Sequence, residues 1–142
     1  MFFAFLNMEP TKPKLYFGHT VDLYGTPKEL ELVRCIEQEF PDYEVENPSQ
    51  PVHEEGYQTY KRETGKGMDY YFQKVLPAMA GGVFQPFADG KFGAGVFGEA
   101  KFLHEQGKPI YEITLEGVVS TLELDASRAL SVEETRKRVY KK

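Results

Sequence analysis

The sequence predicts an α/β fold in which helices cover both faces of a mostly parallel sheet. Three features of the chain carry this prediction: short apolar runs that end near glycine or proline, helix starts marked by N-cap residues, and the alternation of the two along the sequence. When each strand is followed by a helix, successive strands favour parallel pairing and the helices pack back on the sheet.

The first strand and the first helix have clear local signals. Residues 14–18 (KLYFG) are a short apolar run that ends at a glycine, which predicts a strand. Thr26, Pro27 and Glu29 fit the N-cap, N1 and N3 positions of a capping box. Until Pro41, apolar residues then recur at helical spacing, at Leu32, Val33, Ile36 and Phe40. We expect this helix to pack on the sheet through that stripe.

The middle of the chain is less regular. Residues 43–45 predict a short second strand, and the polar residues 46–66, with their proline and glycine, predict a long loop. From Gly67 onward, one helical face gathers apolar side chains, and Pro77 should kink or shorten that helix. The residues on this face are Met68, Phe72, Val75, Leu76 and Met79.

A third strand is expected at residues 82–87. The glycine-rich segment 89–95 then opens a further helix, which Gly107 ends. The apolar face of this helix consists of Val96, Phe97, Ala100 and Leu103.

Two more strands, at 109–113 and 117–124, and a basic terminal helix complete the pattern. Ser131 and Glu134 form the capping box of that helix. The order of elements predicts a single domain over residues 1–142 with a flavodoxin-like or Rossmann-like fold. In such sheets ligands bind beyond the carboxyl ends of the strands.

Composition narrows the classes of function. The 17 basic and 22 acidic side chains give a formal charge of −5, which disfavours a nucleic-acid partner. The three histidines and the single Cys35 show no metal-ligand spacing, so neither a metal nor another cofactor is expected. The apolar start Met1 to Leu6 is too short for a signal or a membrane span, so we expect a cytoplasmic protein without a membrane partner.

Two acidic residues are candidates for chemistry at the strand ends. At about 100° per residue, Asp69 and Glu99 each fall on the flank of the apolar stripe of their helix, where a side chain can face a cleft. Position alone does not distinguish such an acid from a solvated surface acid. Lys91, among glycines at a helix start, indicates either a phosphate site or a flexible turn.

Four segments together resemble the nucleoside 2-deoxyribosyltransferase family. They are residues 15–18 with Tyr16, residues 67–71 with Asp69, residues 93–100 with Glu99, and the helix end and strand at 107–111. The resemblance covers residues 14–113. His19 after Gly18 departs from the family pattern, as do the small residues Ala78, Ala80, Gly81 and Gly82.

The resemblance implies a base exchange between 2′-deoxynucleosides with retained configuration. Glu99 would be the nucleophile that attacks the anomeric carbon, Tyr16 would hold its carboxylate, and Asp69 would orient the substrate and handle a proton. Gly18, His19, Asp89, Gly93 and Gly95 would contact the substrate. Nucleosides and nucleobases would be the partners.

Two other functions remain open: hydrolysis by an N-glycosidase with the same residues, and a non-catalytic module that senses nucleotides. The family resemblance also implies an oligomer with shared sites. The apolar segment Met1 to Leu6 and the number of aromatic residues likewise predict a homo-oligomer.

Overall fold

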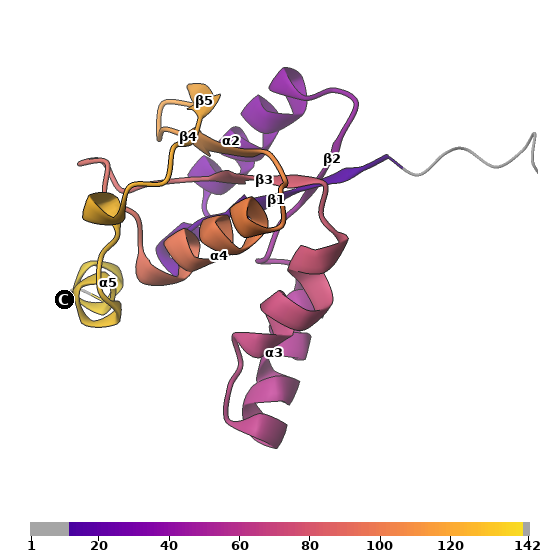
Figure 1. Cartoon of the computed structure of the whole chain (residues 1–142), viewed down its shortest axis with the longest axis vertical. Helices are drawn as coiled ribbons and strands as arrows, with labels where there is room; N and C mark the ends of the chain where they lie inside the picture. Colours follow the sequence, from indigo (N-terminus) through magenta and orange to yellow (C-terminus); the bar gives the residue numbers. More distant parts are fainter. Residues whose placement is uncertain (1–11, 141–142) are drawn as a thin grey trace, which may run out of the picture.

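The computed structural model of the chain describes residues 12–140, and within them five strands form one sheet in the order β2-β1-β3-β4-β5 (Figure 1). The strands are β1 (Lys14–Gly18), β2 (Glu44–Glu46), β3 (Gly81–Phe84), β4 (Ile110–Ile113) and β5 (Val119–Thr121). The first four are parallel, and β5 runs antiparallel to β4. This strand order is that of flavodoxin-like doubly wound sheets, so the predicted α/β fold is confirmed.

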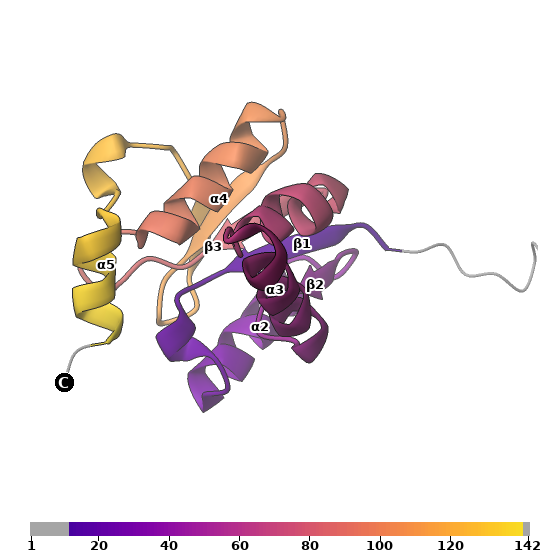
Figure 2. The ribbon, with the colours of Figure 1, turned by 90° about the horizontal axis from the view of Figure 1, so that it is seen from below.

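Alternate residues of β1 and β3 supply the two faces of the sheet. Leu15 and Phe17 of β1 pack with Val83 of β3 against α2 (Pro27–Glu39). Tyr16 and Phe84 belong to the other core cluster, which includes α4 (Ala94–Glu105). Figure 2 shows α2 and α4 on opposite sides of the sheet. Both faces are therefore covered, as parallel sheets require.

The helix starts follow the capping signals of the sequence. Thr26 accepts a hydrogen bond from the Glu29 backbone at 3.2 Å, with Pro27 at the first position of α2. The Glu29 carboxylate accepts from the Gly25 backbone instead of the Thr26 backbone, so half of the predicted box is present. The terminal helix α5 (Val132–Val139) has its complete capping box.

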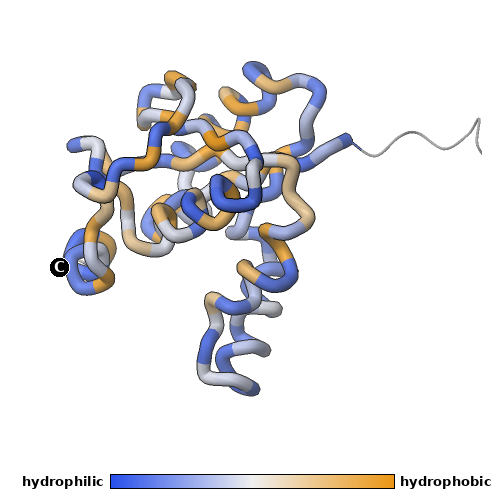
Figure 3. Tube along the Cα trace, viewed as in Figure 1, coloured by the Kyte–Doolittle hydropathy of each residue, from blue (hydrophilic) through white to orange (hydrophobic). Residues whose placement is uncertain are grey.

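Residues 46–66 differ from the prediction of a loop, because most of them form the helix α3 (Pro51–Thr64). Pro51 starts this helix, and Gly65 ends it in the left-handed conformation at φ 76°. His53 is its single buried residue, so the helix presents no apolar stripe to detect. The helix projects from the sheet and is mostly hydrophilic (Figure 3).

The segment after α3 is a broken helix rather than the kinked one that was expected. Asp69 and Tyr70 are helical, and they lead into a π-helical turn, η2 (Tyr71–Val75), and a 3-10 turn, η3 (Leu76–Ala78). Pro77 has no backbone N–H and its ring clashes with the carbonyl four residues earlier, so a regular α-helix cannot pass through it. The broken helix still buries Tyr71, Val75 and Leu76.

Helix α5 lies beside the start of α4 (Figure 1). After β5, a short turn, η4 (Ala126–Arg128), leads to a parallel bridge between Ala129 and Phe92 of the glycine-rich segment. Helix α5 follows this bridge. The strands expected at 82–87 and 117–124 are shorter than predicted, and the segment Met1 to Leu6 lies outside the described residues. None of the described helices combines the length and the hydropathy needed to cross a bilayer.

Two glycine substitutions should change stability in opposite directions. A Cβ on Gly81 would lie 2.6 Å from the backbone oxygen of Pro109, whereas a Cβ on Gly98, inside α4, meets nothing within 4 Å. We expect Gly81→Ala to lower the free energy of unfolding by about 1–3 kcal/mol through overpacking. Gly98→Ala should raise it by about 0.5–1 kcal/mol because alanine loses less backbone entropy in a helix. Urea unfolding of both variants measures this, and equal effects would contradict the packing at Gly81.

Candidate active site

A cavity of about 340 Å³ opens beside the carboxyl end of β1. Strand β1 connects onward to β2 on one side, and β3 lies on its other side, so the cavity sits where the strand order reverses. This is the place where doubly wound sheets bind ligands. Its walls come from the end of β1, the π-helical turn, the start of α4, and α5.

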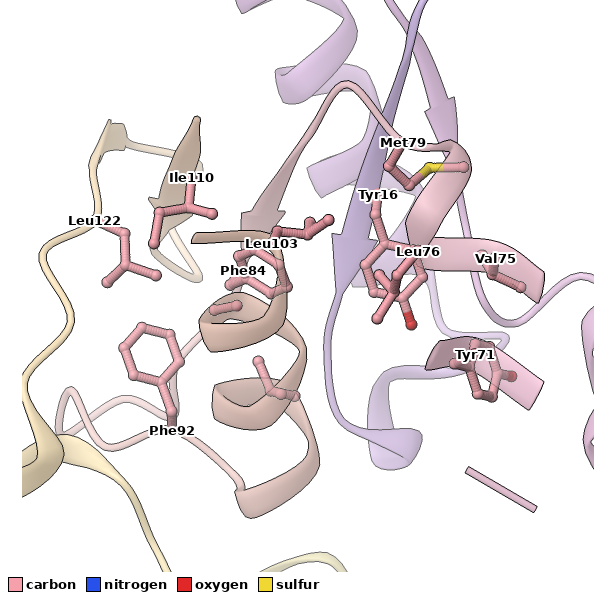
Figure 4. Close-up of a cluster of buried hydrophobic side chains, with 12 residues drawn as sticks. Tyr16, Tyr71, Val75, Leu76, Met79, Phe84, Phe92, Leu103, Ile110 and Leu122 are labelled. Carbon is pink, nitrogen blue, oxygen red and sulfur yellow. The ribbon is translucent and has the colours of Figure 1, made fainter. Parts of the chain in front are cut away.

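The centre of the site is a hydrogen bond between Tyr16 and Glu99. The Tyr16 hydroxyl donates to Glu99 Oε2 at 2.7 Å, and both side chains are buried. Tyr16 points from the sheet into the cluster with Leu76, Tyr71 and Phe84 (Figure 4). Glu99 lies on the same side of α4 as the buried Val96, Ala100 and Leu103. The structure therefore brings these two predicted residues together.

Because Gly18 has no side chain, the Glu99 carboxylate and the Phe84 ring can pack close to its backbone. A Cβ at Gly18 would overlap the Phe84 ring and would lie 3.3 Å from Glu99 Oε1. Gly18 therefore lies next to the Glu99 carboxylate, and it does not line the cavity.

Burial sets the ionisation of the site. Desolvation raises the pKa of Glu99 to about 8, against a smaller lowering by the Tyr16 hydrogen bond. Burial also raises the pKa of Tyr16, Tyr24 and Tyr71, with the Glu99 charge adding to each shift. The phenols therefore stay protonated, and Tyr16 remains a hydrogen-bond donor to Glu99.

His19 lines the cavity from the loop after β1. Its side chain is fully buried, and it stacks on Phe17 with ring centroids 4.3 Å apart. Nε2 lies 3.0 Å from Asn47 Oδ1 and 3.2 Å from Glu29 Oε2, while Nδ1 lies 3.2 Å from the Thr20 carbonyl oxygen. Both ring nitrogens thus face acceptor oxygens of the protein.

The glycine-rich segment contributes Gly93 and Gly95 to the cavity wall. Gly93 is the N-cap of α4 and has no side chain to cap the helix, so the Thr135 hydroxyl accepts from the Ala94 backbone at 2.9 Å instead. Lys91 donates to the carbonyl of Ser127 at 2.8 Å. The start of α4 is therefore held by the C-terminal segment.

Asp69 and Asp89 do not line the cavity. Met68 lines the cavity, but Asp69 does not. Asp89 is about half exposed and forms a bidentate pair with Arg138 at 3.0 and 2.8 Å. The Arg138 hydrogen bonds lower the pKa of Asp89 to about 2. The structure thus gives Asp89 a contact with α5 rather than a place in the cavity wall.

Helix α5 forms a wall of the cavity that the sequence did not indicate. It contributes Val132, Thr135, Arg136, Val139 and, just after the helix, Tyr140. The capping box at Ser131 predicts the helix itself. Its position depends on contacts between distant segments, including two Arg128 hydrogen bonds to Glu112 at 2.9 and 2.8 Å, and these leave no local pattern.

Within residues 12–140, no group of three or more histidine, cysteine or acidic side chains is placed to hold a metal ion. Comparisons of the chain with protein-family models, curated proteins and solved structures found no match.

The raised pKa of Glu99 predicts a pH-dependent gain in stability for Glu99→Gln. The folded-state pKa of about 8 exceeds the ordinary value of 4.5, so the native protein loses stability as pH rises between these values. In the Glu99→Gln variant the side chain carries no charge, so its folded state does not lose stability through ionisation at this position. We expect the advantage of the variant over the parent protein to grow by roughly 3–5 kcal/mol between pH 4.5 and 8.5.

Urea unfolding at a series of pH values measures that difference. Glu105→Gln, at an exposed position on the same helix, is the matched control and should track the parent protein. A constant difference between Glu99→Gln and the parent across this range would show that folding does not raise the pKa of Glu99.

Proposed function

We propose that the protein transfers a 2′-deoxyribosyl group between nucleobases, with Glu99 as the nucleophile and Tyr16 as its positioning residue. The observation that carries the proposal is the buried Tyr16–Glu99 hydrogen bond at 2.7 Å in the wall of the cavity at the strand ends. A buried carboxyl group with a strongly raised pKa is costly to keep, and such groups concentrate at functional sites.

The chemistry follows from a carboxylate beneath the sugar. Breaking the glycosidic bond develops positive charge on the sugar ring, which a carboxylate stabilises and can trap as a covalent ester. One Glu99 oxygen accepts from Tyr16, which leaves the other, above Gly18, for the anomeric carbon. A second nucleobase then attacks the glycosyl-enzyme from the face that the first base left. Two displacements give net retention of configuration.

The make-up of the cavity favours this double displacement over direct hydrolysis. Inverting enzymes need a second carboxylate about 6.5–9.5 Å away to activate water. Among the described residues that line the cavity, Glu99 is the one carboxylate. Hydrolysis of the glycosyl-enzyme by water is the related activity, and it is distinguished by turnover without an acceptor base. A module that only senses nucleotides would bind without any turnover.

Glu99→Gln should lower base exchange by several orders of magnitude while nucleoside binding largely survives, because the amide keeps the shape but loses the charge and nucleophilicity. Tyr16→Phe should cost much less, since it removes one hydrogen bond from a carboxylate that remains. The exchange rate is measured by chromatography of reactions that contain a deoxynucleoside and a second free base, with Glu105→Gln as the control.

A second experiment identifies the nucleophile. Mass spectrometry of protein trapped with a slow 2-fluoro nucleoside analogue should place the sugar on Glu99. Native exchange rates in Glu99→Gln would refute the assignment.

The exchange rate should also depend on pH through Glu99. The carboxylate must be ionised to attack, and the pKa of Glu99 is about 8. We expect kcat/KM to rise about tenfold per pH unit below that value and to level off above it. A profile measured from pH 5.5 to 9.5 tests this. A rate that instead falls as pH rises through 8 would make Glu99 a proton donor rather than the nucleophile.

A further inference from the structure

We propose that the preferred substrates are nucleosides whose base is a cationic, N-quaternised heterocycle, such as a pyridinium, which leaves the sugar without taking up a proton. This substrate class rests on the transferase function proposed above. It follows from the groups that line the cavity and from the hydrogen bonds that already occupy them.

A neutral purine or pyrimidine needs a proton as it departs, and enzymes supply it from a positioned acid. Among the described lining residues the carboxyl group is that of Glu99, which is needed at the anomeric carbon. Asp69 lies outside the lining, and Asp89 is paired with Arg138. Within residues 12–140, no second carboxyl group lines the cavity, and the charge of Glu54 acts on the lining residues Tyr24 and Tyr71 from outside that lining.

The other polar groups of the lining are poorly suited to give a proton. Both ring nitrogens of His19 face protein acceptors, on Thr20, Asn47 and Glu29. The pKa of the buried phenols Tyr16 and Tyr24 is raised, which makes them weaker acids than free tyrosine. A guanidinium such as that of Arg136 does not deprotonate in proteins.

The same lining suits a positive charge. The faces of tyrosine rings attract cations, and Tyr24, Tyr57 and Tyr71 line the cavity together with Glu99. The formal charge of −5 also favours the approach of a cation. Arg136, exposed on α5, is the one Lys or Arg side chain among the described lining residues.

The bond changes balance without a proton when the base is cationic. A Glu99 oxygen forms a bond to the anomeric carbon, and the C–N bond breaks. Its electron pair passes to the ring nitrogen, and the base leaves neutral. In the second step the nitrogen of a neutral pyridine attacks the anomeric carbon and displaces the carboxylate, which regenerates a cationic nucleoside.

The test compares nicotinamide 2′-deoxyriboside, which carries a fixed charge, with thymidine, 2′-deoxycytidine and 2′-deoxyadenosine. Each is incubated with the full chain and with 3-acetylpyridine as the acceptor, and the products are separated by chromatography against blanks without protein. We expect kcat/KM for the cationic substrate to exceed the others by at least about 100-fold, because a positioned acid contributes roughly 10²- to 10⁴-fold to a neutral leaving group. Glu99→Gln should abolish the reaction, and Glu105→Gln should not affect it.

The outcomes separate this inference from the proposed function. If neutral deoxynucleosides react within tenfold of the cationic one and depend on Glu99, the substrate class is wrong but the transferase function stands. If no nucleoside reacts, either with 3-acetylpyridine or with a second free nucleobase as the acceptor, both fail. Asp69→Asn adds a second check: the inference expects an unchanged rate with the cationic substrate, and a loss of 100-fold or more would show that Asp69 takes part.

A pair of variants at Tyr24 tests the recognition of charge. Tyr24→Leu removes the aromatic face and should raise KM for nicotinamide 2′-deoxyriboside by roughly 2- to 30-fold, while Tyr24→Phe keeps the face and should stay near the parent value. Equal KM values in the two variants would show that no cation–π contact operates at this position.

Discussion

The buried carboxyl group of Glu99 is the constraint on which the site depends. It sits between β1 and α4, receives the Tyr16 hydroxyl, and lies over a position where only glycine fits. These requirements link the register of β1 to the rotation of α4: Tyr16 must face α4, and Gly18, two residues later on the same face, must leave room for the carboxylate. The geometry of the site is thereby fixed by the hydrophobic core rather than by loops.

That placement has an energetic consequence for the whole molecule. A carboxyl group whose pKa is raised to about 8 by burial destabilises the folded state once it ionises. The two hydrophobic clusters on either face of the sheet have to offset this cost. The core on the Glu99 side is built mainly from aromatic and aliphatic side chains that stay neutral. In the proposed reaction, a low-polarity surrounding of this kind would also strengthen the attraction between the carboxylate and a developing positive charge.

The parts of the fold that the sequence predicted are those with local signals. Thr26 and Pro27 mark α2, Ser131 marks α5, and the apolar run 14–18 marks β1. Helix α3 was missed because His53 alone is buried, so its sequence carries no apolar period. Its polar surface is mostly solvated, and what fixes it is an internal contact of His53 with Glu46 and Tyr70 that only the folded chain brings together.

The sequence predicted the placement of some residues of the candidate site but not of others, as it did for the elements of the fold. The apolar run predicted the strand that carries Tyr16, and the glycine-rich segment predicted the helix that carries Glu99, whereas the pairing of the two side chains was implied by the resemblance to nucleoside 2-deoxyribosyltransferases. Asp69 does not line the cavity, and the regular 100° per residue assumed for its helix does not continue through the π and 3-10 turns that follow it.

Helix α5 is held against the rest of the chain by polar contacts that do not involve Tyr16 or Glu99. Helix α5 has no buried residue, so directed polar contacts hold it: Arg138 to Asp89, Arg128 to Glu112, and Thr135 to the start of α4. Salt screens exposed charge pairs, whereas the Tyr16–Glu99 bond is buried and shielded from it. Substitutions on α5 are therefore expected to reshape the part of the cavity that this helix lines without disturbing the Tyr16–Glu99 hydrogen bond. Asp89, which the sequence predicted as a substrate contact, instead pairs with Arg138 of α5, the helix that lines the cavity.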